Sequence, residues 1–430
     1  MTTILHDPQF DIHPHRGNLH SGWLPRQDSA TMRTYVERVL GTERTALAPS
    51  VQALATYIED EAVVRRLARD ACAEYLDAID AHSPHIGDVD TLLHCFNTIL
   101  THAPCFIDGE LVGLPFCAFM AGIGRTVGGA ALFRQPTVHL LTSNILNDWH
   151  DFLDSPASNT GFRVDGEQWL APAVKERYRF PLWRKDAGGP PCWNSWNAFL
   201  TRSFEDPGQA RPVADPASNQ TVICPVDGMR KMASGFADVH LADLLASPVP
   251  RQQALIDDYR LVDRFTGGQV FQAHLTAYDF HRWWAPVNGE VLFDPFTIPG
   301  CFFNPPVLPG AGGAATPTPS CQGHARGVIV IATEDHGHVC CIPLGMSAAS
   351  SVVFDPGMRR GATVRKGQEM GMFKQGGASC VLLFERLPGK ELVFVDVDDA
   401  PAAHRPDASA GTDSQRMLAG SRIGIWCANK

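Results

Sequence analysis

The string His336-Gly-His338-Val-Cys340-Cys341 is the part of the sequence most like a metal site. Alternation along a strand places His336, His338 and Cys340 on one face, and imidazole and thiolate groups are ligands that zinc prefers. The string lacks a fourth ligand at a typical spacing, and the sequence has no Cys-x-x-Cys pair, phosphate loop, dinucleotide fingerprint or Gly-x-Ser-x-Gly elbow. We therefore expect no metal site here, but a strand edge with partly exposed histidines.

Three further strings stand out in the second half of the chain. They are Tyr278-Asp-Phe-His-Arg-Trp-Trp-Ala-Pro-Val-Asn-Gly289, Pro299-Gly-Cys-Phe-Phe303 and Gly371-Met-Phe-Lys-Gln-Gly-Gly-Ala-Ser-Cys380. In this order they resemble the phosphatidylserine decarboxylase family, and most of all its soluble branch, which is similar to the fungal L-tryptophan decarboxylases. The resemblance includes the helical N-terminal portion and residues 194–204, so it covers nearly the whole chain.

The resemblance implies a cofactor made from the chain itself. Members of this family cut a Gly-Ser bond, and the new N-terminus becomes a pyruvoyl group that forms a Schiff base with the substrate amine and accepts the electrons released with carbon dioxide. The cut needs a hydroxyl, a base and a carboxylate that orients the base. By this comparison Asp227 is the orienting carboxylate, and His281 is the first histidine of the family's Asp-x-His-Arg string.

Two positions depart from the family pattern. The family's second histidine corresponds to Trp284, and the serine that is cut corresponds to Ala378. An indole nitrogen cannot act as a general base and a methyl group cannot attack a carbonyl, so the usual maturation route is closed.

Three explanations of these departures are open. Ser379 serves as a nucleophile shifted by one residue, with His281 or another histidine as its base, and a pyruvoyl group then forms. Alternatively the chain stays uncleaved without a cofactor, and it either uses Asp227, His281, Ser379 and Cys380 for another reaction or binds a ligand without turnover. The third explanation is an introduced serine-to-alanine change at 378, against which the second departure at Trp284 argues.

The predicted site combines residues with three expected roles. Asp227, His281 and Ser379 are the candidate catalytic residues, Gly376, Gly377 and Ala378 form the turn that presents the reactive residue, and Asp279, Trp284, Phe302, Phe303 and Cys380 are the expected pocket residues. The many aromatic residues near these strings suit an aromatic side chain, so a small amino acid or another amine-bearing carboxylate is the expected partner. Structural roles are the alternative, because aspartate is common in turns and cysteine in cores.

The elements that must hold these residues indicate an α+β fold. Residues 1–155 are expected to form a helical domain, because apolar residues recur at helical spacing, as in the stripe Val63, Val64, Leu67, Ala68, Ala71, Cys72, Tyr75, Leu76 and Ile79. Residues 156–220 are expected to be an aromatic-rich connector. Residues 221–430 are expected to be a β-rich domain, with short strand-like runs at 327–333, 339–343 and 380–384. Asp227-Gly228, Asn288-Gly289 and the segment 364–371 favour tight hairpin turns.

The composition excludes several classes of partner. The chain of 430 residues carries 36 Lys and Arg against 46 Asp and Glu, a formal net charge of -10. Nucleic acids and anionic membrane surfaces call for clustered basic residues, so we expect neither as a partner. The most apolar stretch, 111–124, is shorter than the roughly 18 to 20 residues of a membrane-spanning helix, and no signal-peptide pattern is present. We expect a soluble, cytoplasmic protein with reduced cysteines.

Overall fold

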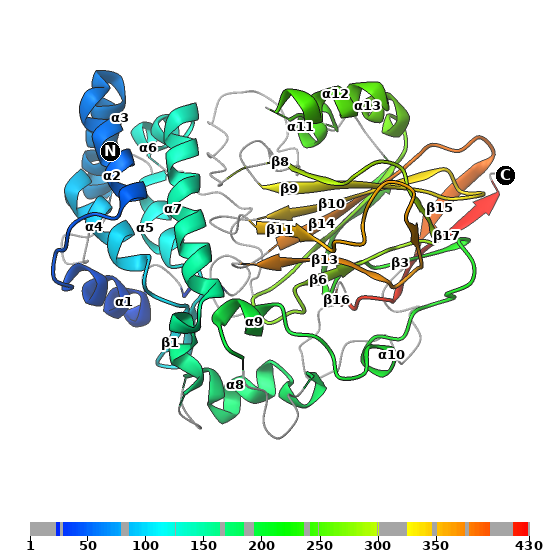
Figure 1. The fold of residues 1–430 in the computed structure, drawn as a ribbon, viewed down its shortest axis with the longest axis horizontal. Helices are drawn as coiled ribbons and strands as arrows, with labels where there is room; N and C mark the ends of the chain where they lie inside the picture. The colour runs from blue at the N-terminus through cyan, green and yellow to red at the C-terminus, as the bar shows by residue number, and fades with distance from the viewer. Residues whose placement is uncertain are drawn as a thin grey trace.

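The structure is a computed structural model in which a helical part stands beside a β-sandwich (Figure 1). It describes residues 23–25, 29–78, 86–124, 126–163, 168–184, 193–235, 241–247, 249–298, 300, 325–345, 351–374, 378–395 and 416–428. The expected α+β class is confirmed within these residues. None of the described helices is long and apolar enough to cross a membrane.

The helical part is built from amphipathic helices and one short hairpin. Val64, Ala68, Ala71 and Cys72 of α3 are buried as the stripe predicts, but Val63 is 67% exposed. Position 63 lies about 100° around the helix from Val64, which turns it away from the buried face. The elements are α1 (Ala30–Leu40), α2 (Pro49–Asp60), α3 (Ala62–Ala78), α4 (Val89–Ile99), β1 (Cys105–Ile107), β2 (Glu110–Val112), α5 (Pro115–Gly124), α6 (Val127–Phe133) and α7 (Pro136–Asp154).

The connector is part of the same core rather than a separate layer. Its aromatic side chains, such as Trp169, Tyr178 and Phe199, belong to the apolar cluster of the helical part, and the Trp169 and Phe199 rings lie 4.9 Å apart between centroids. Large aromatic rings supply much buried area per residue, which compensates for the scarcity of regular structure in this segment. Its elements are η2 (Pro156–Phe162), η3 (Gln168–Leu170), α8 (Pro172–Arg177), η4 (Phe180–Leu182), α9 (Trp196–Leu200) and α10 (Pro207–Ala210).

The β-rich part contains one large antiparallel sheet, two three-stranded sheets and three short helices. The large sheet has the order β12-β7-β9-β10-β14-β5-β4-β16, with β8 on β9, and the small sheets have the orders β11-β13-β6 and β15-β17-β3. The strands are β3 (Thr221–Ile223), β4 (Gly228–Gly235), β5 (Gln269–His274), β6 (Arg282–Trp284), β7 (Gly289–Val291), β8 (Phe296–Ile298), β9 (Arg326–Ala332), β10 (His338–Gly345), β11 (Ser351–Phe354), β12 (Thr363–Val364), β13 (Glu369–Lys374), β14 (Ala378–Phe384), β15 (Lys390–Phe394), β16 (Arg416–Met417) and β17 (Arg422–Ala428). The helices are α11 (Leu241–Leu245), α12 (Pro250–Asp258) and α13 (Leu261–Phe265).

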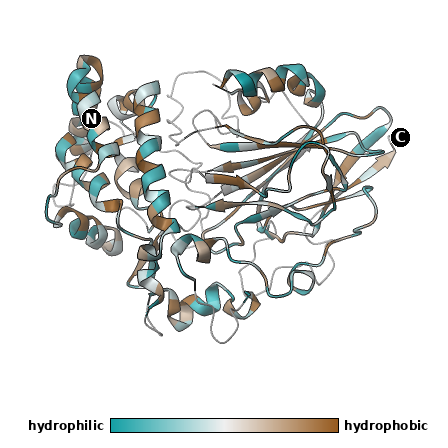
Figure 2. Ribbon diagram, viewed as in Figure 1, coloured by the Kyte–Doolittle hydropathy of each residue, from teal (hydrophilic) through white to brown (hydrophobic). Residues whose placement is uncertain are grey.

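The two faces of the large sheet bury different cores. Cys380, Leu382 and Phe384 of β14 face the small sheets, whereas Val381 and Leu383 face α11, α12 and α13. The strands are accordingly hydrophobic along much of their length, while the helices alternate hydrophobic and hydrophilic residues (Figure 2). Alternation along β14 places Ser379 on the helix-covered face with Val381.

The three expected hairpins are wrong, although turns do occur at those positions. β3 and β4 flank Asp227 but belong to different sheets, and the same holds for β6 and β7 and for β12 and β13. At each place the chain crosses from one layer of the sandwich to another, because the strands that bury the matching faces are distant in sequence.

Candidate functional site

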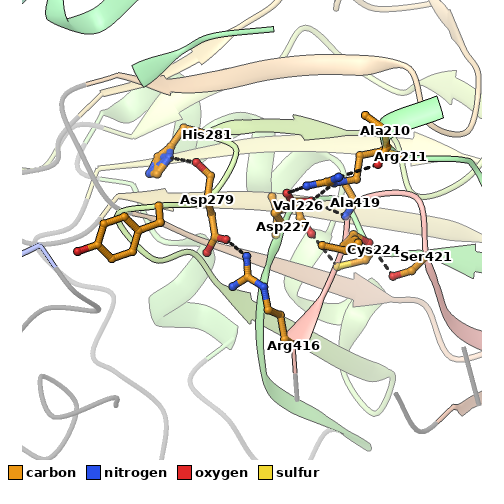
Figure 3. A network of polar contacts seen from close by, with 12 residues as sticks. Ala210, Arg211, Cys224, Val226, Asp227, Asp279, His281, Arg416, Ala419 and Ser421 are labelled. Carbon is orange, nitrogen blue, oxygen red and sulfur yellow. Dashed lines mark hydrogen bonds and ion pairs between the residues drawn. The ribbon is translucent and has the colours of Figure 1, made fainter. Parts of the chain in front are cut away.

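Asp227 lies at a crossing between sheets and is paired with an arginine. Its carboxylate accepts hydrogen bonds from Arg211 Nε at 2.7 Å and from the Ala419 backbone N–H at 2.9 Å, and Arg211 Nη2 also contacts its second oxygen (Figure 3). Both side chains are buried, at 6% and 2% exposure. Burial lowers the pKa of Arg211, but the Asp227 carboxylate outweighs it and holds that pKa above its usual value. Asp227 therefore serves here as the partner of a buried cation, and among the described residues its carboxylate makes no hydrogen bond to the His281 ring.

Gly228 fixes how closely the chain approaches β5 beside Asp227. A Cβ atom at this position would lie 2.4 Å from the His274 carbonyl oxygen, which belongs to the backbone and cannot move aside easily. Only glycine therefore allows β4 to start directly after Asp227.

We expect Gly228→Ala to lower the free energy of unfolding by about 1–3 kcal/mol, because the added methyl group forces two strands apart. Gly87→Ala is the matched control, since no atom lies within 4 Å of its added Cβ. Urea unfolding of both variants checks the prediction, and equal stability of the two would contradict it.

Asp279 and His281 lie on the loop between β5 and β6. The Asp279 carboxylate accepts from the Thr276 N–H at 2.6 Å and from Arg416 (Figure 3). Burial acts to raise the pKa of Asp279, but Arg416 and the hydrogen bonds lower it below its usual value, so this side chain is a carboxylate. The Asp279 carbonyl oxygen contacts both His281 Nδ1, at 3.3 Å, and Arg202 Nη2, at 3.0 Å.

His281 is completely buried beneath an aromatic ring. Trp23 meets it edge to face, with 5.4 Å between ring centroids. Burial, reinforced by the Arg202 charge, lowers the pKa of His281 to about 3, against a smaller opposing effect of Asp227. The imidazole is therefore neutral at physiological pH, and its Nε2 atom has no hydrogen-bond partner.

Trp284, the residue predicted to correspond to the family's second histidine, packs in the apolar core. Its side chain is buried in the cluster that the helical part and the connector share, and its ring lies 6.1 Å from Phe280. Its backbone N–H donates at 2.8 Å to the carbonyl oxygen of Pro225, two residues before Asp227. This residue thus contributes apolar packing, not proton transfer, at the position that it occupies.

Ser379 is held inside the large sheet. Its hydroxyl donates to Ala273 O at 2.9 Å and accepts from Gln272 Nε2 at 2.9 Å. Cys380 is buried on the other face, and burial, together with Cys341 and Cys224, raises the pKa of its thiol well above its usual value. Among the described residues, neither side chain makes a hydrogen bond to His281 or Asp227.

Gly376, Gly377, Phe302 and Phe303 lie outside the described residues, and Ala378 is the first residue of β14.

The string with His336 and His338 forms a turn and a strand end. His338 Nδ1 lies 2.7 Å from Glu385 Oε2, and Arg264 contacts both residues, while Cys340 is buried against α11, α12 and α13. Among the described residues no group of three or more His, Cys, Asp or Glu side chains could hold a metal ion.

Sequence reasoning missed the cations of the site. Arg202, Arg211 and Arg416 bind the carbonyls and carboxylates of the site loops, and Trp23 covers His281. Arg202 could have been found from the sequence, because it lies within the segment 194–204 that resembles the family. No local motif or spacing identifies Trp23 or Arg416 as site residues.

The α+β fold agrees with the family that sequence comparison identifies. The phosphatidylserine decarboxylase family model matches residues 196–401, and a second model of the same description matches residues 48–178. The chain belongs to the phosphatidylserine decarboxylase family.

Individual relatives in this family are decarboxylases. Decarboxylase iboD of Amanita muscaria is 26% identical over 300 residues, which are 63% of this chain and 84% of that protein. L-tryptophan decarboxylase of Psilocybe cubensis is 24% identical over 396 residues, covering 84% of this chain and 87% of the relative. Phosphatidylserine decarboxylase proenzyme of Chlamydia muridarum is 28% identical over 221 residues, covering 51% and 68%.

The family in general depends on a pyruvoyl group, but the residues present here do not fit one. Ala378 has no hydroxyl from which the group could form, and the Ser379 hydroxyl is engaged on the helix-covered face of the sheet. We therefore derive no catalytic step through a pyruvoyl group.

Proposed function

We propose that the chain remains one polypeptide and binds an aromatic amino acid, or a related amine-bearing carboxylate, at the His281 site without releasing carbon dioxide. The family membership and the named decarboxylase relatives support an amino acid ligand, and the L-tryptophan decarboxylases support an aromatic one. Without a carbonyl cofactor there is no acceptor for the electron pair that decarboxylation releases, so binding without turnover follows.

The observation that carries this proposal is the position of the Ser379 hydroxyl. To attack the Ala378 carbonyl it would have to leave both Gln272 and the Ala273 carbonyl. A shift of one residue along a strand also moves a side chain to the opposite face of the sheet. A hydroxyl at 379 is therefore a poor substitute for one at 378.

Intact mass tests the uncleaved state directly. We expect one chain of 46.8 kDa for the purified protein and for Ser379→Ala alike, and no labelling by a carbonyl-reactive hydrazide. Isothermal titration with L-tryptophan should show binding, and the same solution should release no carbon dioxide. A fragment of 52 residues, about 6 kDa at about 110 Da per residue, would contradict the proposal.

A second candidate function is decarboxylation by a pyruvoyl group formed at Ser379, and one observation favours it. His274 is paired directly with Ser379 between β5 and β14, so both side chains lie on the same face. His274 could therefore act as a base for Ser379, the serine that directly follows Ala378. This candidate predicts the 52-residue fragment, its loss in Ser379→Ala, and its reduction in His274→Gln.

A further inference from the structure

Four buried residues at the seam between the helical part and the sandwich hold polar atoms without partners. They are Trp23, Trp196, Arg202 and His281, which we call the seam cluster, and each is at most 2% exposed. Trp23 Nε1, Trp196 Nε1, Arg202 Nε and His281 Nε2 have no hydrogen-bond partner among the residues that the structure describes. Buried polar atoms are usually paired, so four such atoms together indicate a missing group.

Ring contacts join Trp23 to Trp196 and to His281, and one backbone oxygen links His281 to Arg202. The Trp23 ring lies 6.3 Å from Trp196 and 5.4 Å from His281, measured between ring centroids. His281 Nδ1 and Arg202 Nη2 approach the same oxygen, the Asp279 carbonyl. α9, which begins at Trp196, lies between the helical part and the sandwich (Figure 1), and Figure 3 shows His281 and Asp279 on the adjoining loop.

The backbone fixes Trp23 in this position. Its carbonyl oxygen accepts from the Gly113 N–H at 2.8 Å, and a Cβ atom at position 113 would lie 2.4 Å from the indole ring. The indole thus rests directly on a glycine of the helical part. Other buried indoles of the same apolar cluster do have partners, since Trp149 donates to His102 O at 2.9 Å and Trp169 to Pro104 O at 3.0 Å.

The chemistry of the unpartnered atoms defines the missing group. Indole N–H and guanidinium Nε–H are donors only, so three of the four atoms require an acceptor. Arg202 also carries a positive charge without a carboxylate: its described hydrogen bonds go to the carbonyls of Phe199, Leu200, Tyr278 and Asp279. Asp227 and Asp279 are already paired with Arg211 and Arg416. An acceptor with negative charge satisfies both requirements.

We propose that the seam cluster binds the carboxylate of the ligand, with the Trp23 and Trp196 N–H groups and the Arg202 guanidinium as donors. This inference rests on the proposed function and specifies which group of the amino acid the protein recognises. The burial of these donors excludes water, which strengthens hydrogen bonds to an anion.

Calorimetric titration with three probes tests the inference: L-tryptophan, 3-(indol-3-yl)propanoate, which lacks the amine, and tryptamine, which lacks the carboxylate. We expect both carboxylates to bind at least tenfold more tightly than tryptamine. Trp23→Phe and Trp196→Phe keep the ring and remove the N–H, so each should weaken carboxylate binding about fivefold while leaving tryptamine unchanged. Arg202→Lys should weaken it about tenfold, because lysine keeps the charge but loses the planar donors.

Trp169→Phe is the matched control. Its N–H already has a carbonyl partner, so this change should lower the melting temperature and leave ligand affinity unchanged. Trp23→Phe should melt like the wild type, because its N–H has no partner to lose. If Arg202→Lys does not fold, the two indole variants decide the outcome.

The results separate the inference from the proposed function. L-Tryptophan binding that is equal in the wild type and the indole variants, with tryptamine bound as tightly, would overturn the inference and leave amino acid binding standing. Binding of 3-(indol-3-yl)propanoate but not L-tryptophan, lost in the variants, would support the inference and overturn the proposed ligand. Failure of both carboxylates to bind at millimolar concentration would overturn both.

Discussion

Asp227→Asn is expected to lower the free energy of unfolding by about 3–5 kcal/mol at pH 7, because it leaves the Arg211 guanidinium buried without a counterion. Both side chains are almost fully buried, and the pair joins the end of α10 to the start of β4. Because asparagine still accepts hydrogen bonds, the loss of unfolding free energy measures the effect of removing the negative charge of Asp227. Urea unfolding followed by circular dichroism measures it.

An exposed ion pair of the same kind gives the control. Arg260 and Asp263 lie 2.9 Å apart with side chains 76% and 66% exposed, and Asp263→Asn should cost less than about 1 kcal/mol. Replacing both Arg211 and Asp227 by apolar residues of similar volume should recover much of the loss, since no buried charge then remains. If Asp227→Asn is no more harmful than Asp263→Asn, Asp227 is not the counterion of Arg211.

The same pair bears on the role that the family comparison implies for Asp227. A carboxylate that orients a histidine must contact it, whereas the contacts of Asp227 are with Arg211 and the Ala419 N–H. The same comparison predicts that Trp284 replaces a histidine, and in the structure the Asp227 carboxylate is paired with Arg211.

The sequence predicted elements well where the signal is local. The runs at 327–333, 339–343 and 380–384 coincide with β9, β10 and β14, since buried strands carry continuous apolar residues. Turn chemistry was a weaker guide to pairing. Asp108-Gly109 does close a hairpin between β1 and β2, with φ of 49° and 79°, whereas Asp227-Gly228 leads from one sheet to another. A turn motif reports backbone shape, and burial across the whole sandwich selects the partner strand.

The candidate site shows the same division. The motifs placed Asp279, His281 and Trp284 on one short segment. In the structure Trp284 donates to the Pro225 carbonyl in the segment before Asp227, while separate arginines bind Asp279 and Asp227. Trp23, Arg202 and Arg416 come from segments up to several hundred residues away, so only the tertiary fold brings them together. Buried charges that pair over long sequence separations produce no local sequence pattern from which the pair could be predicted.

His281 is expected to make the protein less stable as the pH falls from about 6.5 towards 3. Burial and the Arg202 charge hold the pKa of His281 at about 3 in the folded state, whereas an unfolded histidine has a pKa of about 6.5. Between these values the unfolded chain binds a proton on this residue and the folded chain does not. Unfolding therefore becomes easier with acid, by about 1 kcal/mol per pH unit.

His281→Gln removes the titrating group while keeping a planar polar side chain of similar size. Its unfolding free energy, measured in urea at half-unit steps from pH 7 to pH 4, should fall less steeply than that of the wild type. Because both proteins share every other ionisable group, including Arg202, Asp227 and Asp279, the difference between the two curves isolates His281. Parallel curves would mean that His281 takes up a proton in the folded protein without ligand, and would contradict the prediction. A difference that widens below pH 6.5 would instead show that the ring stays neutral in the folded protein without ligand, as its burial beneath Trp23 requires.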